Sequence, residues 1–408
     1  MSSVPPEGSR EGGRTVSKVT KPESKPGGVP ARKKVKKALR SAKANLLAGI
    51  EMAQGAMAAR LLGAGDNQET LFCFYDLKKQ PISFDFPWYL CLADVERRRR
   101  QLSGLHVVFV SAGDWQDGTE KNEAYRAVVD GESRRWRFEN ILLPICGLVP
   151  SVTGYSFCGR RALAVSLGRL ARTNRFPADY TANAPGYVVR NRPLIEAARE
   201  GIPVQALRAN EQGLRYVRQW IDTHADGKRV VTITLRQYDF EVARNSDVAA
   251  WGQFASKLRD DGFFPVIIPD TDKAMLGLPA ELDGLPFFPE VAWNLGLRAA
   301  LYELAWVNLG STGGPTWGLW LLNANTRFLI FKAIVESERL SSEQHHRKIS
   351  HPVDEQFPFS GRFQRVLWRT PDDFPSISRE FHKMAAEIEA VEDSSDAMED
   401  PAVSVRSA

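Results

Sequence analysis

Compact apolar runs alternate with amphipathic stretches along most of the chain. The runs at Leu71–Tyr75, at His106–Gly113 and within "RFENILLPICGLVP" (137–150) predict three buried strands, and the stretches at 88–102 and 159–172 predict helices. Strands that alternate with helices are typical of a parallel sheet covered by helices on both faces.

The pattern weakens at residues 181–196, where Pro and Gly recur, and then starts again. The second block predicts helices over 213–225, Ser246–Asp261, Pro289–Leu304, after Pro315 and over 375–391, and strands at 228–237, 263–270, Ala305–Leu309 and Arg327–Lys332. Ser246 or Asn245 is expected to cap the second of these helices, and Gly262 suits its C-terminal cap.

These blocks predict an α/β protein with two Rossmann-like domains that face each other across a cleft. We expect a disordered basic tail over 1–40, an N-terminal domain over 41–190, a C-terminal domain over 191–390 and a disordered tail over 391–408. In open parallel sheets, ligands bind at the carboxyl ends of the strands, so the candidate functional residues are those that follow strands.

Composition is that of an ordinary globular protein, with 43% hydrophobic and 25% charged residues, and a net charge of +5 concentrated near the N-terminus. The basic run "ARKKVKKALRSAK" suits weak contact with an anionic membrane or nucleic acid, or it is simply a solvated tail. The four cysteines match neither a zinc site nor a redox pair. The uncharged stretches 140–159 and 305–326 are broken by Pro and Gly, so we expect no membrane span and a cytoplasmic protein, peripheral to the inner membrane face if the basic tail binds there.

The segment "AWVNLGSTGGPTWG" (305–318) carries a glycine-rich turn after a predicted strand. Gly313 and Gly314 allow a ligand to approach the backbone, Pro315 suits a helix start, and Ser311 and Thr312 add hydroxyl donors. This pattern suits a phosphate, although a purely structural turn explains it as well. It matches neither a P-loop nor a dinucleotide fingerprint.

Other strand ends in the second block add charged candidates. Arg236 and Arg244 suit a diphosphate, although each is also placed for an ion pair with a nearby aspartate. Asp270 and Thr271 suit the hydroxyls of a nucleoside or sugar, or a local cap, and Arg298 on the 289–304 helix is expected to join them in the nucleoside or sugar site.

The first block supplies carboxylates for acid–base chemistry. Asp76, Asp85 and Asp114 follow predicted strands or lie in adjoining loops, and one of them is expected to serve as general base. Arg160 and Arg161 also fit positions in the cleft. His345, His346 and His351 lack a pattern of metal ligands and are expected to be ordinary surface histidines, so we predict no metal site and no cofactor.

Three segments of the second block resemble GT-B glycosyltransferases, most closely their fucosyltransferase-like branch. They are "VVTITLRQYDFEVARNS", "FFPVIIPDTDKA" and "WVNLGSTGGPTWG", and the "FYDL…P…FDF" opening looks similar to that of uncharacterised bacterial transferase-like proteins. The resemblance implies a GT-B-like fold, with Arg236 on the donor diphosphate, Asp270 or Thr271 at the nucleoside and Ser311–Gly314 around phosphate. It differs in that Leu235 stands where the family pattern has a histidine, and Arg244 comes later than the family's second arginine.

The resemblance implies a metal-independent transferase that moves a sugar from a nucleotide-diphosphate donor to a hydroxyl acceptor, in polysaccharide or glycoconjugate synthesis. Two alternatives remain open: a non-catalytic ligand-binding or scaffold protein with the same fold, and a nucleotide-sugar epimerase. The sugar, the acceptor, the stereochemical outcome and the oligomeric state are not determined by the sequence.

Overall fold

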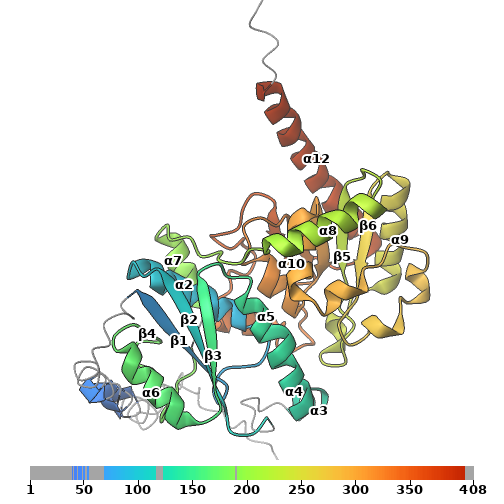
Figure 1. The fold of residues 1–408 in the computed structure, drawn as a ribbon. Helices are drawn as coiled ribbons and strands as arrows, with labels where there is room; N and C mark the ends of the chain where they lie inside the picture. Colours follow the sequence, from blue (N-terminus) through green and yellow to red (C-terminus); the bar gives the residue numbers. More distant parts are fainter. Residues whose placement is uncertain are drawn as a thin grey trace, which may run out of the picture.

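The computed structural model describes residues 69–115, 123–188 and 191–399, together with part of 39–54, whose described residues are helical. Two parallel β-sheets, each covered by helices, lie beside each other (Figure 1). The expected α/β class with two sheet domains is therefore confirmed. The expected N-terminal tail lies outside the described residues, except for Leu39.

The first sheet has the order β3-β2-β1-β4, and all its strands are parallel. The strands are β1 (Thr70–Asp76), β2 (Gly104–Val110), β3 (Val152–Cys158) and β4 (Arg175–Phe176). Helix α2 (Phe86–Arg99) connects β1 to β2, and α6 (Arg161–Ala171) follows β3. The β1 side chains are almost all buried, as expected for a strand covered on both faces.

One predicted strand of the first half is wrong. The run "RFENILLPICGLVP" forms helix instead, in η1 (Phe138–Leu142) and α5 (Leu143–Cys146), preceded by α3 (Glu123–Val128) and α4 (Gly131–Arg137). The third strand, β3, comes directly afterwards. A short apolar run fits a buried helix as well as a buried strand, because burial on all sides removes the periodicity that separates them.

The second sheet has the order β6-β5-β7-β8-β9, again all parallel. Its strands are β5 (Val230–Thr234), β6 (Phe264–Ile268), β7 (Val307–Ser311), β8 (Phe328–Phe331) and β9 (Gln364–Val366). One face packs against α8 (Glu211–His224) and α10 (Leu295–Leu304), and the other against α9 (Val248–Asp260) and α12 (Phe374–Glu399).

Details at the helix ends differ from the predictions. Asp247, not Ser246 or Asn245, caps α9, and its carboxylate accepts the N–H of Ala250 at 3.1 Å. The predicted helix Pro289–Leu304 is divided into a 3-10 turn, η5 (Pro289–Ala292), and α10, which Asn294 caps. Helix α12 continues to Glu399, past residue 391, where the C-terminal tail was expected to begin.

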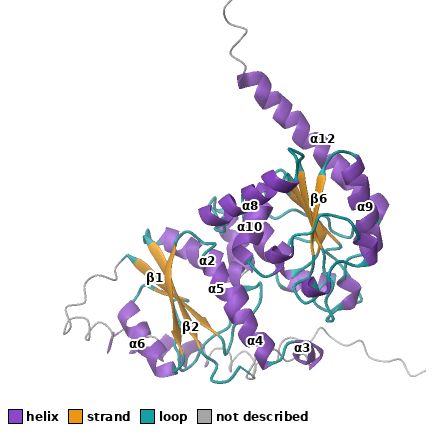
Figure 2. Ribbon diagram, turned by 45° about the vertical axis from the view of Figure 1, so that its right-hand side comes forward, coloured by secondary structure: helices purple, strands orange, loops and turns teal. Residues whose placement is uncertain are grey.

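The two halves share one continuous hydrophobic core, which includes buried residues of both sheets and of α5 and α10. Helices α5 and α10 lie between the two sheets (Figure 2). Helix α7 (Asn191–Arg199) packs against α2 of the first half, and the chain then runs extended to α8. The predicted boundary near residue 190 stays a prediction. All four cysteines are buried and unpaired. Among the described residues, no helix is both long and apolar enough to cross a membrane.

Candidate functional site

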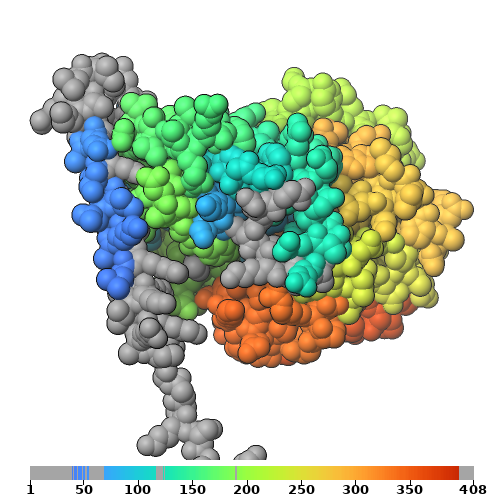
Figure 3. All heavy atoms as spheres, turned by 90° about the horizontal axis from the view of Figure 1, so that it is seen from below, coloured from blue at the N-terminus to red at the C-terminus, as the bar shows by residue number. Residues whose placement is uncertain are grey.

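Segments of the first half lie directly against segments of the second half when the molecule is seen from below (Figure 3). Arg137 of α4 donates to the hydroxyl of Tyr238, in the loop after β5, at 2.9 Å. The ring of Tyr125 in α3 packs edge-on against Phe240 of the same loop, with 5.2 Å between ring centroids. Residues that follow strands in either half are therefore close to the other half.

Asp76 is buried in the first half, and both oxygens of its carboxylate accept hydrogen bonds from other residues. Its carboxylate forms a salt bridge with Arg161 and accepts hydrogen bonds from the hydroxyl of Tyr180 at 2.9 Å and from the N–H of Lys78 at 3.1 Å. These contacts use the four acceptor positions of a carboxylate. Asp76 therefore has no free lone pair with which to accept a proton in this structure, and Arg161 is its structural partner.

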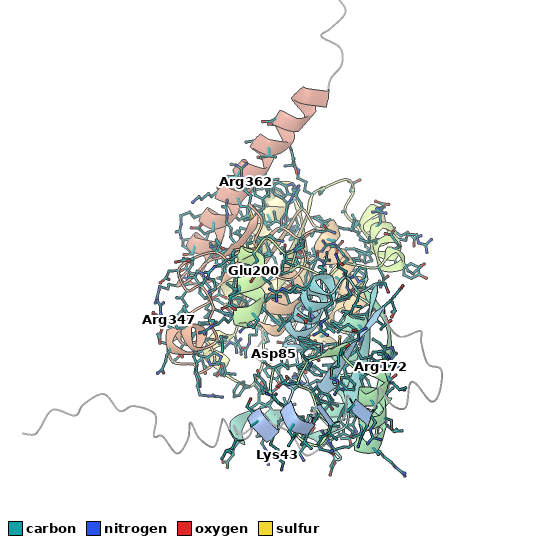
Figure 4. The ribbon with its side chains drawn as sticks, turned by 90° about the vertical axis from the view of Figure 1, so that its left-hand side faces the viewer. Lys43, Asp85, Arg172, Glu200, Arg347 and Arg362 are labelled. Carbon is teal, nitrogen blue, oxygen red and sulfur yellow. The ribbon has the colours of Figure 1, made fainter. Side chains whose placement is uncertain are left out.

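Asp85 and Asp114 are both exposed. Asp85 immediately precedes α2 and accepts a hydrogen bond from Ser83 at 2.9 Å. Figure 4 labels it together with Arg347 of α11 (Glu343–Lys348) in the second half. The charge of Asp85 reaches His345 of α11: burial lowers the pKa of that histidine, and Asp85 acts in the opposite direction. Asp114 adjoins 116–122, outside the described residues. Of the three predicted bases, Asp85 is thus the one that the described contacts place toward the second half.

The donors of the predicted glycine turn are engaged inside the protein. Ser311 donates to Asp372 at 2.7 Å, Thr312 donates to the carbonyl of Lys332 at 2.7 Å, and the Gly313 N–H donates to Thr316 at 2.9 Å. The expected helix after Pro315 is a short π-helical turn, η6 (Thr316–Trp320). A phosphate bound here would have to displace these hydrogen bonds.

Gly314 has a packing role that the sequence analysis missed. A Cβ at this position would lie 2.7 Å from the ring of Phe84, which comes from the first half, whereas a Cβ on Gly313 would meet nothing closer than 3.9 Å. The glycine at 314 therefore makes room for a side chain of the other half, which is sufficient to explain it without a ligand.

The Arg236 side chain forms hydrogen bonds within the loop that follows β5 (residues 236–245). Its guanidinium donates to the carbonyl of Glu241 at 3.0 Å, to the side chain of Asn245 and to the carbonyl of Phe240. Burial lowers its pKa to about 10, and the nearby charge of Arg244 adds to that effect. The predicted two-pronged contact with a diphosphate would compete with these hydrogen bonds.

Arg244 forms the ion pair that was the alternative prediction, although its partner is Glu241 at 3.0 Å and not an aspartate. Glu241 also accepts the N–H of Leu340 at 2.9 Å, which ties this loop to residues 335–341. Burial lowers the pKa of Arg244, and Glu241 opposes the shift. Its Nε atom is buried without a hydrogen-bond partner among the described residues.

Asp270 and Arg298 are brought together at the same edge. Arg298 has 2% of its surface exposed, donates from Nε to Tyr302 at 2.7 Å and forms no ion pair among the described residues. Burial raises the pKa of Asp270, and the charge of Arg298 acts against that rise. Thr271 instead donates to the carbonyl of Ala292 at 3.0 Å, so its hydroxyl is used locally.

A second polar cluster, which surrounds Asp372, was not expected from the sequence. The carboxylate accepts from Ser311, from the Trp251 indole at 3.1 Å and from the Asp247 N–H at 3.1 Å, and lies 3.3 Å from the Lys332 ammonium. The sequence placed Lys332 at the end of a predicted strand and indicated no role for it. Asp372 follows no strand directly, so position in the pattern gave no signal for it. The cluster ties β7, β8 and α9 together at the edge.

The prediction of surface histidines is wrong for His346 and His351. His346 donates from Nε2 to the carbonyl of Ala333 at 3.0 Å, so its Nδ1 accepts from Nδ1 of His351 at 2.9 Å. The ring of His351 stacks with Trp88 of the first half and with Trp317 of the second, at centroid distances of 5.8 and 5.0 Å. Burial lowers the pKa of His346 to about 4. These histidines are part of the packing between the halves.

No cluster of three or more His, Cys, Asp or Glu side chains suited to a metal ion occurs among the described residues. What the edge offers a ligand is charge and hydrogen bonding: a buried guanidinium at Arg298, a carboxyl group with a raised pKa at Asp270, and the Tyr238 and Arg137 side chains from opposite halves.

Comparison with known proteins gives distant structural likenesses only. No family model matches the chain, and no curated protein matches its sequence. The solved structures include a family 9 glycosyl transferase from Veillonella parvula, which is 10% identical, with 77% of this chain and 89% of that chain covered and a TM-score of 0.43. The ADP-heptose lps heptosyltransferase II of E. coli is also 10% identical, with 79% and 99% covered and a TM-score of 0.46.

A Listeria monocytogenes protein described as a UDP-N-acetylglucosamine 2-epimerase is 8% identical, with 79% and 89% covered and a TM-score of 0.32. None of these three is a fucosyltransferase, so that branch of the resemblance stays a prediction. With TM-scores below 0.5 the alignments carry no argument on activity, and the fold class rests on the two parallel sheets themselves.

Proposed function

We propose that this protein binds a nucleoside-diphosphate sugar at the carboxyl edge of its second sheet and transfers the sugar to a hydroxyl acceptor. The observation that carries the proposal is the pair formed by Arg298 and Asp270. Arg298 is buried and Asp270 is half-buried at the edge where parallel sheets bind ligands, and neither is in an ion pair among the described residues.

Arg298 is the group best suited to the donor diphosphate. A guanidinium offers a planar fork that matches phosphate oxygens, and low exposure strengthens its interaction with charge that develops on the leaving diphosphate. Asp270 suits a hydroxyl of the ribose or sugar, because carboxylate oxygens accept hydrogen bonds from hydroxyl groups. The glycine turn and Arg236 would contribute only if their internal hydrogen bonds rearrange.

The acceptor would approach from the first half. In the transfer, the bond from the anomeric carbon to the diphosphate oxygen breaks, a bond to the acceptor oxygen forms, and the hydroxyl proton passes to a carboxylate. We assign Asp85 this role ahead of Asp114, because its charge reaches α11 of the second half, whereas Asp76 is fully bonded.

The test is a thermal-shift titration with UDP, GDP, CDP, dTDP and ADP, each with and without EDTA. One nucleotide should raise the melting temperature, and Arg298→Gln should remove the shift, whereas Arg218→Gln on the exposed face of α8 should keep it. Asp85→Asn should retain the shift and lose transfer of sugar from the matching nucleotide sugar. A wild-type protein that responds to none of the five nucleotides would contradict the proposal.

A second candidate is a ligand-binding protein without transferase activity. The observation in its favour is that Arg236, Ser311 and Thr312, which the transferase resemblance assigns to phosphate, are hydrogen-bonded within the protein. It predicts that a nucleotide diphosphate raises the melting temperature while the corresponding nucleotide sugar is left intact over long incubation with varied hydroxyl acceptors.

A further inference from the structure

A polar cavity of about 290 Å³ lies away from the edge described above, next to the segment that joins the two halves. It adjoins the end of α2 and the start of β3, and so lies toward the amino ends of the first sheet's strands. The polar side chains that line it are Asp94, Arg97, Arg98, Ser151, Gln205 and Arg208.

Asp94 fixes two of the arginines. Its carboxylate accepts from Nε of Arg97 and from Nε of Arg98, each at 2.7 Å, and from the hydroxyl of Ser151 at 2.6 Å. Burial alone would raise the pKa of Asp94, but these three hydrogen bonds outweigh it and lower the pKa. The carboxylate thus stays ionised and orients both guanidinium groups from their Nε sides.

The cavity keeps a positive charge after this pairing. Three guanidinium groups and one carboxylate leave a net charge of +2 on its lining. Arg97 uses one terminal nitrogen on the carbonyl of Leu102 at 2.7 Å, and Arg208 uses one on the carbonyl of Leu207 at 2.5 Å. Both terminal nitrogens of Arg98 have no hydrogen bond to any described residue, and 42% of its side chain is exposed.

We propose that this cavity binds a phosphate monoester dianion. The charge of −2 on such a ligand would balance the net charge of +2 on the lining. The Arg98 guanidinium is held through Nε, so both of its terminal nitrogens can donate to oxygen atoms of one phosphate. A monocarboxylate would leave half of the excess charge uncompensated. Ser151 and Gln205 supply neutral groups for the rest of the ligand.

The position of the cavity gives the ligand a structural effect. Arg208 donates its backbone N–H to the carbonyl of Leu148 in the first half at 2.7 Å, while Gln205 donates to the carbonyl of Leu321 in the second half at 2.8 Å. Residues 205–208 therefore contact both halves, and a phosphate held by Arg98 and Arg208 would fasten this segment to α2. The proposal does not depend on the function of the other edge.

Isothermal titration of the full chain with inorganic phosphate at pH 7.5 tests the site. Arg98→Gln and, as a second variant, Arg208→Gln should each weaken binding about tenfold or more, because each removes a charge-assisted contact. Arg99→Gln is the matched control: Arg99 is the next residue of α2, lies outside the cavity and pairs with Glu200. It should bind phosphate as the wild type does, and melting temperatures establish that all variants are folded.

Arg298→Gln separates this cavity from the proposed donor edge, since it should retain phosphate binding at the cavity. Acetate should not compete, and binding should weaken as the pH falls from 7.5 to 6, because inorganic phosphate changes from mostly dianion to mostly monoanion over this range. The proposal is overturned if the wild type takes up no phosphate at millimolar concentration, if Arg98→Gln and Arg99→Gln bind equally, or if only Arg298→Gln abolishes binding.

Discussion

The two carboxyl edges differ in whether their buried charged side chains have partners of opposite charge. At the first edge, Asp76 is 1% exposed and has Arg161 and Tyr180 as partners for its carboxylate. At the second edge, Arg298 is 2% exposed and has a tyrosine hydroxyl as its only hydrogen-bond partner among the described residues, and Asp270 is close to it without an ion pair.

The difference indicates which of the two edges is suited to bind a charged ligand. A buried ion pair is complete in itself, and removal of one partner leaves the other charge uncompensated. A buried guanidinium without a carboxylate in contact costs free energy of folding that the Tyr302 hydroxyl and the nearby charge of Asp270 offset only in part, which is typical of groups positioned for an external anion. The first edge is therefore structural at Asp76, and the second is arranged for binding at Arg298.

The largest expected effect is on the first edge. Asp76→Ala should lower the free energy of unfolding by about 3 kcal/mol, because Arg161 and Tyr180 lose their shared acceptor. Chemical denaturation measures it, with Asp222→Ala on exposed α8 as the control. If Asp76→Ala lowers the free energy of unfolding by no more than Asp222→Ala does, Asp76 does not have the structural role assigned to it here.

The contact between the halves should depend on pH through His346. The folded pKa of about 4 lies below the unfolded value of 6.5, so the unfolded chain binds more protons between these values. Stability should be complete above pH 6.5 and should fall as the pH drops toward 4, by up to about 3 kcal/mol from this residue. Denaturation curves at several pH values measure it.

The matched variants for this prediction are His346→Asn and His224→Gln, the latter at an exposed histidine. The first should flatten the dependence on pH between 6.5 and 4, and the second should leave it as in the wild type. If both variants keep the full dependence, carboxylates elsewhere cause it and the histidine pair has no part.

A smaller effect is expected at Gly314, where the two edges touch. Gly314→Ala should cost about 1 kcal/mol, since the new methyl group must push the Phe84 ring aside. Gly313→Ala should change stability by less than about 0.5 kcal/mol because it has room. In a Phe84→Ala background the Gly314→Ala cost should vanish, and its persistence there would show that backbone conformation, not the packing of the halves, requires the glycine.

The smallest expected effect on stability is at the second edge. Arg298→Met should leave the free energy of unfolding within about 1 kcal/mol of the wild type or raise it, because it replaces a buried charge that lacks a carboxylate partner. The same variant should lose the nucleotide-dependent rise in melting temperature. A strong destabilisation comparable with that of Asp76→Ala would remove the contrast between the two edges.

Several features could be predicted from local pattern alone. The runs predicted as strands at 71–75, 106–113 and 228–237 correspond to β1, β2 and β5, although β2 ends at Val110 and β5 at Thr234. Such runs can be recognised because β-branched content and apolar character are properties of neighbouring residues. The pattern also put Asp270 at the end of a strand and Arg298 on the helix that returns to the same edge. It was wrong for 138–146, where a continuous apolar run did not distinguish helix from strand.

The sequence by itself thus determined the alternation of strands and helices, and with it which residues reach a carboxyl edge. Only the tertiary structure decided which of those residues are already bonded. Asp76 meets Arg161, Ser311 meets Asp372, and Trp88 meets His351 across long separations in the chain. Periodicity is a local property, whereas the pairing of a buried charge depends on which distant side chain packs beside it, so Arg298 is distinguished from Asp76 only when the chain is folded.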